Sequence, residues 1–281
     1  LSAIAPNVGL LLLFRFLLGV AIGADYPISS SYVAELMPAR LRGRLMVGAL
    51  SFQAIGAVIG AAVGLALLAG DFAGDGVWRW MLAAGVIPAI VVLILRRDAP
   101  ESPRWAQAHG MTDEAEAITR RLTGGQAVTA STPSEAILPA SALFTPRFLR
   151  RTNLALVPWF LMDLALYGIG LFTPTILGII DIGGESPAGM RLWLAKDIRS
   201  TEGALVLDLF LVIGFVIALL TIDRWGRLLL QKIGFLGMAG GLLIVAAGAS
   251  GRLGGENPAL IIGGFALFNV LVNAGPNSTT W

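Results

Sequence analysis

Seven long apolar runs constrain this chain more than any other feature of its sequence. A helix needs about 20 apolar residues to cross a bilayer, and runs of 18 or more indicate spanning segments. We therefore predict an all-α membrane protein, with residues 1–6 as the tail of a preceding span. The predicted spans are 9–35, 45–70, 79–95, 153–180, 203–222, 228–250 and 258–281.

The composition agrees with a membrane class and excludes several kinds of site. Hydrophobic residues make up 56% of the chain and charged residues only 14%, whereas soluble domains carry roughly 25% charged residues. Cysteine is absent, so neither a disulfide nor a thiolate metal site is possible. The single histidine, His109, lies in a polar stretch and forms no cluster. We expect no metal and no cofactor.

Basic residues gather on alternate connections between the predicted spans, at 40–44, 96–151 and 224–232. Positively charged loops stay on the cytoplasmic side of a membrane, so we expect the long segment to be cytoplasmic. Within it, 112–122 has the pattern of a short helix capped by Thr112, and 124–139 has a linker composition. A basic loop that sets the topology explains this charge, and we expect no nucleic-acid partner.

Both ends of the sequence lie in hydrophobic context. Residue 1 is a leucine rather than a methionine before a basic leader, and Trp281 falls inside the last predicted span. We therefore expect an internal fragment of a larger membrane protein. Its predicted parts are one transmembrane bundle in 1–97, a cytoplasmic loop in 98–152 and a second bundle in 153–281.

A polar stripe interrupts the apolar run at 153–180. Trp159, Asp163 and Tyr167 are spaced i, i+4, i+8 and therefore share one face of a helix. A carboxylate at the centre of a spanning helix costs ~2.5–3.5 kcal/mol on insertion scales, so it needs a reason to be there. The stripe indicates a face that lines a cavity. The alternative is an aspartate paired with a basic residue of a neighbouring helix, beside aromatic residues that only pack.

A second polar group lies in the middle of the first predicted span. Asp25, Tyr26 and Pro27 follow one another there; Pro27 loosens the backbone, and Asp25 needs a partner or water. Gly19 and Gly23, one turn apart, predict a small-residue face for close helix packing.

Acidic and basic residues meet at two predicted cytoplasmic turns. Glu35 and Arg42 lie at the first turn, and Asp223, Arg224 and Arg227 lie at the second. Charge-assisted bonds at such turns can clamp helix ends that separate when two bundles rock. Anchoring of the topology by positive charge is the alternative explanation.

Three motifs resemble the signatures of major facilitator superfamily transporters, especially the sugar porters. The resemblance implies two six-helix bundles, of which this chain covers the end of helix 3 to helix 10, or seven of the twelve helices. The motifs are Glu35-x-x-Pro38 with Arg42-Gly43, Pro100-Glu101-Ser102-Pro103-Arg104-Trp105, and Asp223-Arg224-x-Gly226-Arg227.

Three further features look more like the phosphate:proton symporter family of that superfamily. They are Asp25-Tyr26-Pro27, the stripe at 159, 163 and 167, and Gly275-Pro276-Asn277-Ser278-Thr279-Thr280; Gln53 also falls where that family places a ligand-binding glutamine. The resemblance implies that Asp25 and Asp163 couple protons, and that the family's further aspartate in helix 1 and lysine in helix 11 lie outside this chain. It implies a substrate site of Tyr26, Gln53, Trp159, Asp163, Tyr167 and Asn277.

The chemistry of these side chains agrees with an anion as cargo. Phosphate is rich in acceptor oxygens, which neutral donors such as Tyr26, Gln53 and Trp159 can hold without a cationic cage. A bound anion opposes the ionisation of a nearby carboxylate, because the two charges are alike. A site that contains a carboxylate therefore takes up the anion and a proton together. We therefore predict proton-coupled symport of inorganic phosphate by alternating access.

We expect a multi-pass protein of the plasma (inner) membrane that works as a monomer in the lipid bilayer. One alternative is a proton-coupled transporter of a hexose, an organic acid or an organic cation in the same superfamily; another is a ligand sensor that transports nothing. We expect no enzyme, because no nucleophile–base pair and no phosphate-gripping glycine loop is present.

Overall fold

The computed structural model describes residues 1–36, 42–70, 74–99, 101–122, 139–179, 192–250 and 257–280, and in these ranges it contains helices and no strand. Seven helical segments in the described ranges are long and apolar enough to cross a membrane, so the predicted fold class and the predicted number of spans are confirmed. These segments are Val8–Val33, Gly43–Ala69, Gly74–Arg96, Pro146–Leu177, Trp193–Trp225, Arg227–Ala249 and Pro258–Thr279.

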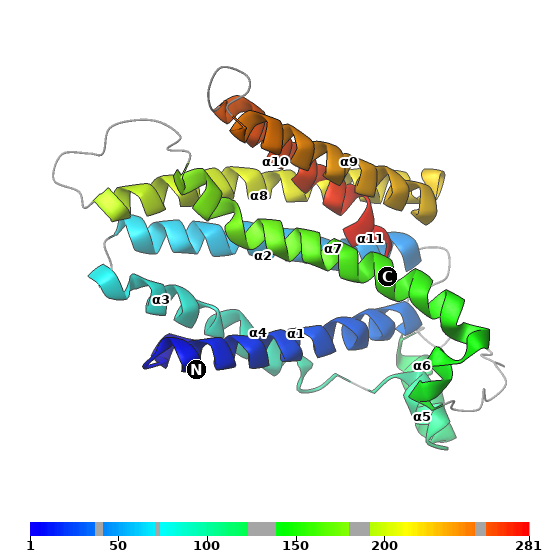
Figure 1. The fold of residues 1–281 in the computed structure, drawn as a ribbon. Coiled ribbons are helices and arrows are strands. Elements are labelled where there is room, and N and C mark those ends of the chain that lie inside the picture. Colours follow the sequence, from blue (N-terminus) through cyan, green and yellow to red (C-terminus); the bar gives the residue numbers. More distant parts are fainter. Residues whose placement is uncertain are drawn as a thin grey trace. The chain divides into compact units, whose positions relative to one another are not determined.

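The individual helices can be followed in Figure 1. Short 3-10 helices lie at Ser2–Ile4 (η1), Gly74–Gly76 (η2) and Ala140–Phe144 (η3). The α-helices are α1 (Val8–Leu36), α2 (Arg42–Ala69), α3 (Val77–Ala84), α4 (Val86–Arg96), α5 (Pro103–Ala108), α6 (Thr112–Leu122), α7 (Pro146–Ile179), α8 (Leu192–Trp225), α9 (Arg227–Ala249), α10 (Pro258–Ala274) and α11 (Pro276–Thr279).

The predicted span at 203–222 is too short, because α8 begins at Leu192. The polar residues before 203 continue the helix, and the hydroxyls of Ser200 and Thr201 donate to the Asp197 carbonyl within it. At 1.5 Å per residue, the 34 residues of α8 exceed the roughly 30 Å hydrocarbon core. Hydropathy located the most apolar part of α8 but not its first turns, which contain polar residues.

The chain divides into two compact units, residues 1–42 with 85–152 and residues 43–84 with 153–281. The first unit holds α1, α4, α5 and α6, and the second holds α2, α3, most of α7 and α8 to α11. The expected division into 1–97, 98–152 and 153–281 assigns parts of this chain to the two bundles of a twelve-helix transporter. That division stays a prediction.

In the first unit, α5 and α6 form a helical pair around buried alanines. Ser102 caps α5 by accepting a hydrogen bond from the backbone N–H of Trp105 at 3.0 Å, and Ala106 of α5 and Ala115 of α6 are almost fully buried. The predicted helix at 112–122 is present as α6, although it begins at Thr112 rather than being capped by it. The predicted linker at 124–139 lies almost wholly outside the described residues.

In the second unit, glycines let α9 and α10 approach closely, and the two helices run side by side in Figure 1. A Cβ added to Gly264 would lie 2.7 Å from the carbonyl oxygen of Gly241. At Gly19 and Gly23 of α1, where the sequence predicted such packing, an added Cβ would meet no atom within 4 Å. The small-residue spacing predicts that close approach is possible, but only a partner helix makes it real.

Apolar clusters join the remaining helices of the second unit to α8, α9 and α10. In one cluster, Met162 of α7 packs with Met238 of α9 and Phe268 of α10. In another, Val47 and Ala54 of α2 pack with side chains of α8. The helices that carry polar candidate residues are therefore anchored by apolar contacts on either side of those residues.

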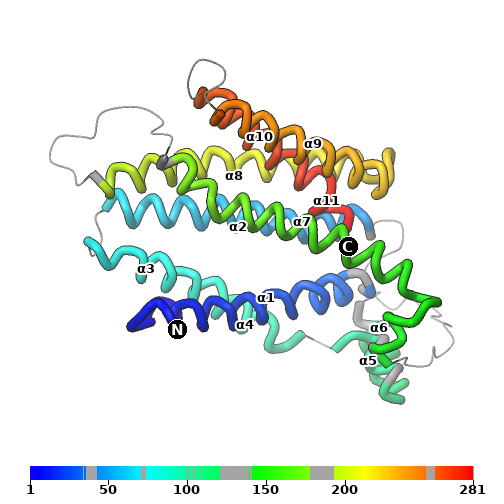
Figure 2. Tube along the Cα trace, in the orientation of Figure 1, coloured from blue at the N-terminus to red at the C-terminus, as the bar shows by residue number. Residues whose placement is uncertain are grey.

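A break separates α10 from α11, and it can be followed near the C-terminal end of the tube in Figure 2. Gly275 has φ −115° and ψ −104° between the two helices, and Pro276 follows it without an N–H to donate. A Cβ on Gly275 would lie 2.6 Å from the Cα of Gly234 in α9. The break therefore presses the start of α11 against α9, so that 276–279 are buried.

Candidate functional site

The polar stripe of α7 contains an internal hydrogen bond. The Nε1–H of Trp159 donates to Oδ2 of Asp163 at 2.6 Å. Asp163 is half-buried beside Met162, which is fully buried, whereas Tyr167 is 42% exposed. Among the described residues, no basic side chain lies within 4 Å of Asp163. The salt-bridged alternative for Asp163 stays open, because the described residues are only part of the chain and supply no such partner.

Two further candidates, Gln53 of α2 and Asn277 of α11, meet across 224 residues of sequence. Nδ2 of Asn277 donates to Oε1 of Gln53 at 3.1 Å and to Oδ1 of Asn273 at 2.6 Å. Asn277 is almost fully buried and Gln53 is half-buried. The structure thus brings these two amides together on neighbouring helices of one unit.

Asn269, Asn273 and Asn277 form an asparagine ladder along α10 and α11, and the first two were not among the residues predicted for the site. Nδ2 of Asn269 donates to the Leu207 carbonyl at 2.8 Å, and Nδ2 of Asn273 donates to the Leu211 carbonyl at 3.3 Å. Residues 269, 273 and 277 have the i, i+4, i+8 spacing that identified the stripe of α7. Applied to the last span, that rule finds the whole ladder.

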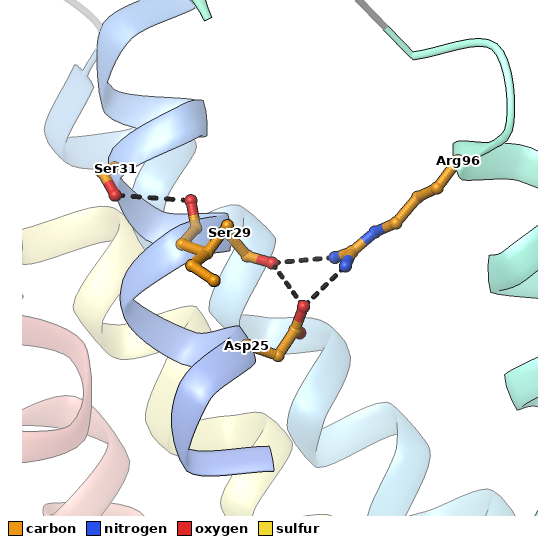
Figure 3. A network of polar contacts seen from close by, with 5 residues as sticks. Asp25, Ser29, Ser31 and Arg96 are labelled. Carbon is orange, nitrogen blue, oxygen red and sulfur yellow. Dashed lines mark hydrogen bonds and ion pairs between the residues drawn. The ribbon is translucent and has the colours of Figure 1, made fainter. Parts of the chain in front are cut away.

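In the first unit, Asp25 of α1 pairs with Arg96 at the end of α4, as Figure 3 shows. Nη1 of Arg96 lies 2.6 Å from Oδ1 of Asp25, and Nη2 donates to Oγ of Ser29 at 2.8 Å. Ser29 in turn donates to Oδ1 of Asp25 at 3.2 Å. The sequence analysis required a partner for Asp25 but placed Arg96 in the basic loop. The adjacent arginines 96 and 97, directly after the third predicted span, were the sequence signal for this partner.

Tyr26 lies next to Asp25 on α1 and is half-buried. It belongs to the first unit, whereas Gln53, Trp159 and Asn277 belong to the second. The structure joins Gln53 to Asn277 and Trp159 to Asp163 by hydrogen bonds. Tyr26 is described only as part of the first unit.

The charged turns expected to act as a clamp are partly described. Nε of Arg44, at the start of α2, lies 2.8 Å from Oδ2 of Asp223 at the end of α8. Arg227 follows the same turn, and its Nη2 would lie 3.8 Å from a Cβ added to Gly43. The pair joins residues of one unit, and Arg44 is the partner that the sequence analysis noted only as a basic residue of the turn.

The other residues of these turns are less informative. Arg224 is exposed, and Oε2 of Glu35 is buried with no hydrogen-bond partner in the described chain. Residues 37–41 and the side chain of Arg42 lie outside the described residues, so the expected pairing of Glu35 with Arg42 stays a prediction.

The described candidates supply neutral N–H donors and carboxylates inside apolar helices. The amide of Gln53 can bind an acceptor-rich molecule and Asp163 can bind a proton, whereas the N–H groups of Trp159 and Asn277 already donate to Asp163, Gln53 and Asn273. Within the described ranges, no group of three or more His, Asp or Glu residues has the geometry to hold a metal ion. The chemistry within reach is therefore binding of a polar solute and of protons.

Known proteins similar to this chain are membrane transporters. A repressible high-affinity phosphate permease of Neurospora crassa is 28% identical, over 98% of this chain and 54% of its own length. A galactose-proton symporter of Escherichia coli is 30% identical, over 86% of this chain and 50% of its own length. This chain thus spans about half the length of these relatives.

The solved structure of the xylose transporter XylE from E. coli, in a partially occluded inward-open conformation, has the same fold. It superposes with a TM-score of 0.61 at 21% identity, over 95% of this chain and 57% of XylE.

The family described as sugar (and other) transporter accounts for the whole sequence, because its model matches residues 1–281. That match confirms the superfamily expected from Glu35-x-x-Pro38 and Asp223-Arg224-x-Gly226-Arg227. With its seven candidate membrane-spanning helices, this chain is an integral, multi-pass membrane protein that belongs to the sugar (and other) transporter family of the major facilitator superfamily.

Proposed function

We propose that the full-length protein is a secondary active transporter that carries inorganic phosphate together with protons by alternating access. The observation that carries the proposal is the hydrogen bond from Trp159 to Asp163 within α7. It holds a carboxylate beside a neutral donor in an apolar span, without a basic partner among the described residues. The similarity to the phosphate permease of N. crassa supports phosphate as the cargo.

In this proposal, neutral donors bind the anion. Gln53, Tyr26 and Tyr167 carry amide and phenol donors that fit the acceptor oxygens of phosphate; Asn277 acts through Gln53, and the indole of Trp159 exchanges Asp163 for the anion. Neutral donors release an anion more easily than a cationic cage does, because they lack a strong charge–charge attraction. Ready release is what a carrier needs at each turnover.

Asp163 and Asp25 carry the protons in this proposal. A proton on Asp163 removes the charge that opposes anion binding, so proton and phosphate enter together. Asp25 exchanges its ion pair with Arg96 for a proton, because the carboxylate attracts Arg96 only while it is ionised. Protonation thus changes the contacts of Asp163 and of Asp25, and such changes can be coupled to the rocking of a bundle.

The same proposal assigns the surroundings of the site. The Arg44–Asp223 pair, with Arg227 nearby, acts as a clamp at the cytoplasmic end of the second unit. The segment 98–152 lies in the cytoplasm, and the protein works as a monomer in the plasma (inner) membrane. No enzymatic reaction, cofactor or nucleic-acid partner is assigned.

A hexose is the second candidate cargo. The galactose-proton symporter of E. coli is 30% identical to this chain, and the amides of Gln53 and Asn277 suit sugar hydroxyls as well as phosphate oxygens. Proton coupling through Asp163 is common to both candidates, so the two differ in cargo and not in mechanism.

Uptake by the purified full-length protein in proteoliposomes tests the proposal. Labelled phosphate should accumulate inside the vesicles when an inward proton gradient is imposed, and the accumulation should collapse when a protonophore is added. Labelled galactose in the same vesicles is the competing cargo. Gradient-driven uptake of galactose without uptake of phosphate would establish the second candidate instead.

A further inference from the structure

The asparagine ladder of α10 and α11 assigns a role to a residue outside the candidate site. We infer that Asn273 is the positioning residue of this site: it orients the amide of Asn277, and through it the amide of Gln53, so that the site offers N–H donors to its ligand. The inference deepens the proposed function and rests on it for the identity of the ligand. Its geometry is confined to the second unit.

The backbone of α8 determines which way the amide of Asn273 points. Nδ2 of Asn273 donates to the carbonyl oxygen of Leu211 at 3.3 Å. The reversed amide would set its own oxygen against that carbonyl, so that two acceptors would face each other with no proton between them. Oδ1 of Asn273 is therefore the atom that faces Asn277.

The orientation passes from Asn273 to the next two amides. An asparagine amide carries two N–H protons on Nδ2. In Asn277 they go to Oδ1 of Asn273 at 2.6 Å and to Oε1 of Gln53 at 3.1 Å. Gln53 therefore turns its oxygen toward Asn277 and its Nε2 group away, and in the described chain that Nε2 donates to no other residue. The half-buried Nε2 is the donor that remains for a ligand.

Burial makes this orientation stable. Asn273 and Asn277 are 1% and 2% exposed, and a buried amide that loses its partner retains the full cost of desolvation. Ser278 strengthens the arrangement because its hydroxyl donates to the Asn273 carbonyl oxygen. Reversal of the amide of Asn273 or Asn277 would break two hydrogen bonds at once, and reversal of Gln53 would break the one that it accepts from Asn277. The pattern of the three amides favours ligands rich in acceptors, such as phosphate.

Asn269 is a matched control within the same helix. It lies one turn before Asn273, and its Nδ2 donates to the α8 carbonyl one turn earlier, that of Leu207, at 2.8 Å. No hydrogen bond links Asn269 to Asn277 among the described residues. Asn269 therefore shares the contact between α8 and α10 with Asn273 but lacks the connection to the site.

Asn273→Ala and Asn269→Ala in the full-length protein, reconstituted in proteoliposomes, separate positioning from packing. Both variants should lower the Tm, and Asn273→Ala should lower it more, because it also leaves an N–H of the buried Asn277 without its acceptor. Asn273→Ala should also raise the KM for phosphate by about tenfold while Vmax per reconstituted protein changes little, because one oriented hydrogen bond is lost. Asn269→Ala should keep the wild-type KM. Equal KM values in the two variants would overturn the inference.

A double-mutant cycle on the Tm tests the connection without a substrate. Asn273→Ala and Asn277→Ala should be non-additive, because the two residues share a hydrogen bond. Asn269→Ala and Asn277→Ala should be additive. If the wild-type protein takes up no phosphate, phosphate is not its substrate. The double-mutant cycle still tests whether Asn273 orients Asn277. Additivity in both cycles would show that Asn273 does not orient Asn277.

Discussion

The indole N–H of Trp159 and the carboxylate of Asp163 form a 2.6 Å hydrogen bond one turn apart on α7. The bond exists because residues at i and i+4 lie above one another on a helix. The buried Met162 next to them holds this part of α7 against α9 and α10. A carboxylate held in this way has one of its oxygens occupied by a donor of its own helix, and the rest of the group is left to bind a proton or a ligand.

Asp163→Asn should abolish proton-driven accumulation of the substrate, because a side-chain amide does not bind and release a proton as a carboxylate does. The variant should still fold and insert, and it should still exchange labelled for unlabelled substrate across the membrane. Uptake into proteoliposomes with and without a proton gradient measures both activities. Trp159→Phe is the control: it removes the donor but keeps the carboxylate, so gradient-driven accumulation should persist with weaker binding. Wild-type accumulation by Asp163→Asn would remove Asp163 from the mechanism.

Asp25→Asn and Arg96→Gln should each lower the Tm of the full-length protein in detergent, because each leaves a charge without its partner. Both side chains are about half-exposed, so the pair itself should contribute less than about 1 kcal/mol in a solvated setting. The double variant should lose less stability than the sum of the single variants. Strict additivity would show that the two side chains are not coupled in the protein.

Reversal of charge tests the pair of Arg44 and Asp223. Arg44→Asp or Asp223→Arg places like charges together and should change the rate of transport by up to about fivefold, as expected for an exposed pair. The double reversal should restore the rate, and the effect of each single variant should weaken at high salt. Initial uptake rates at two ionic strengths provide the measurement. Failure of the double reversal to restore transport would assign these residues to topology alone.

Gly264→Ala should lower the stability of the protein by about 1–3 kcal/mol, because its Cβ would meet the Gly241 carbonyl oxygen at 2.7 Å. Gly19→Ala is the matched control, since a Cβ at that position meets no atom within 4 Å and alanine favours a helix over glycine. Its Tm should stay at the wild-type value or rise slightly. Thermal unfolding of both variants in the same detergent compares them, and equal losses would contradict the packing described for α9 and α10.

The spans and the stripe of α7 were predictable because they depend on residues that are near one another in sequence. The bounds of α6 and the shared face of Trp159 and Asp163 follow from helical periodicity alone. The early start of α8 was not predictable from hydropathy, because the first turns of the helix contain polar residues. The close packing expected at Gly19 and Gly23 stays a prediction, because no described residue lies within 4 Å of a Cβ added there and a small-residue pattern does not name its partner helix.

The sequence by itself determined the membrane class, the number of spans and the identity of the polar residues within them, because each of these depends on composition and on the 3.6-residue repeat. Only the tertiary structure decided which residues pair: Asp25 with Arg96, Asp223 with Arg44, and Gln53 with Asn277, which also donates to Asn273. These partners lie 71 and 224 residues apart in two of the cases. A hydrogen bond depends on distances of about 3 Å, and no local pattern in the chain carries that information across such separations.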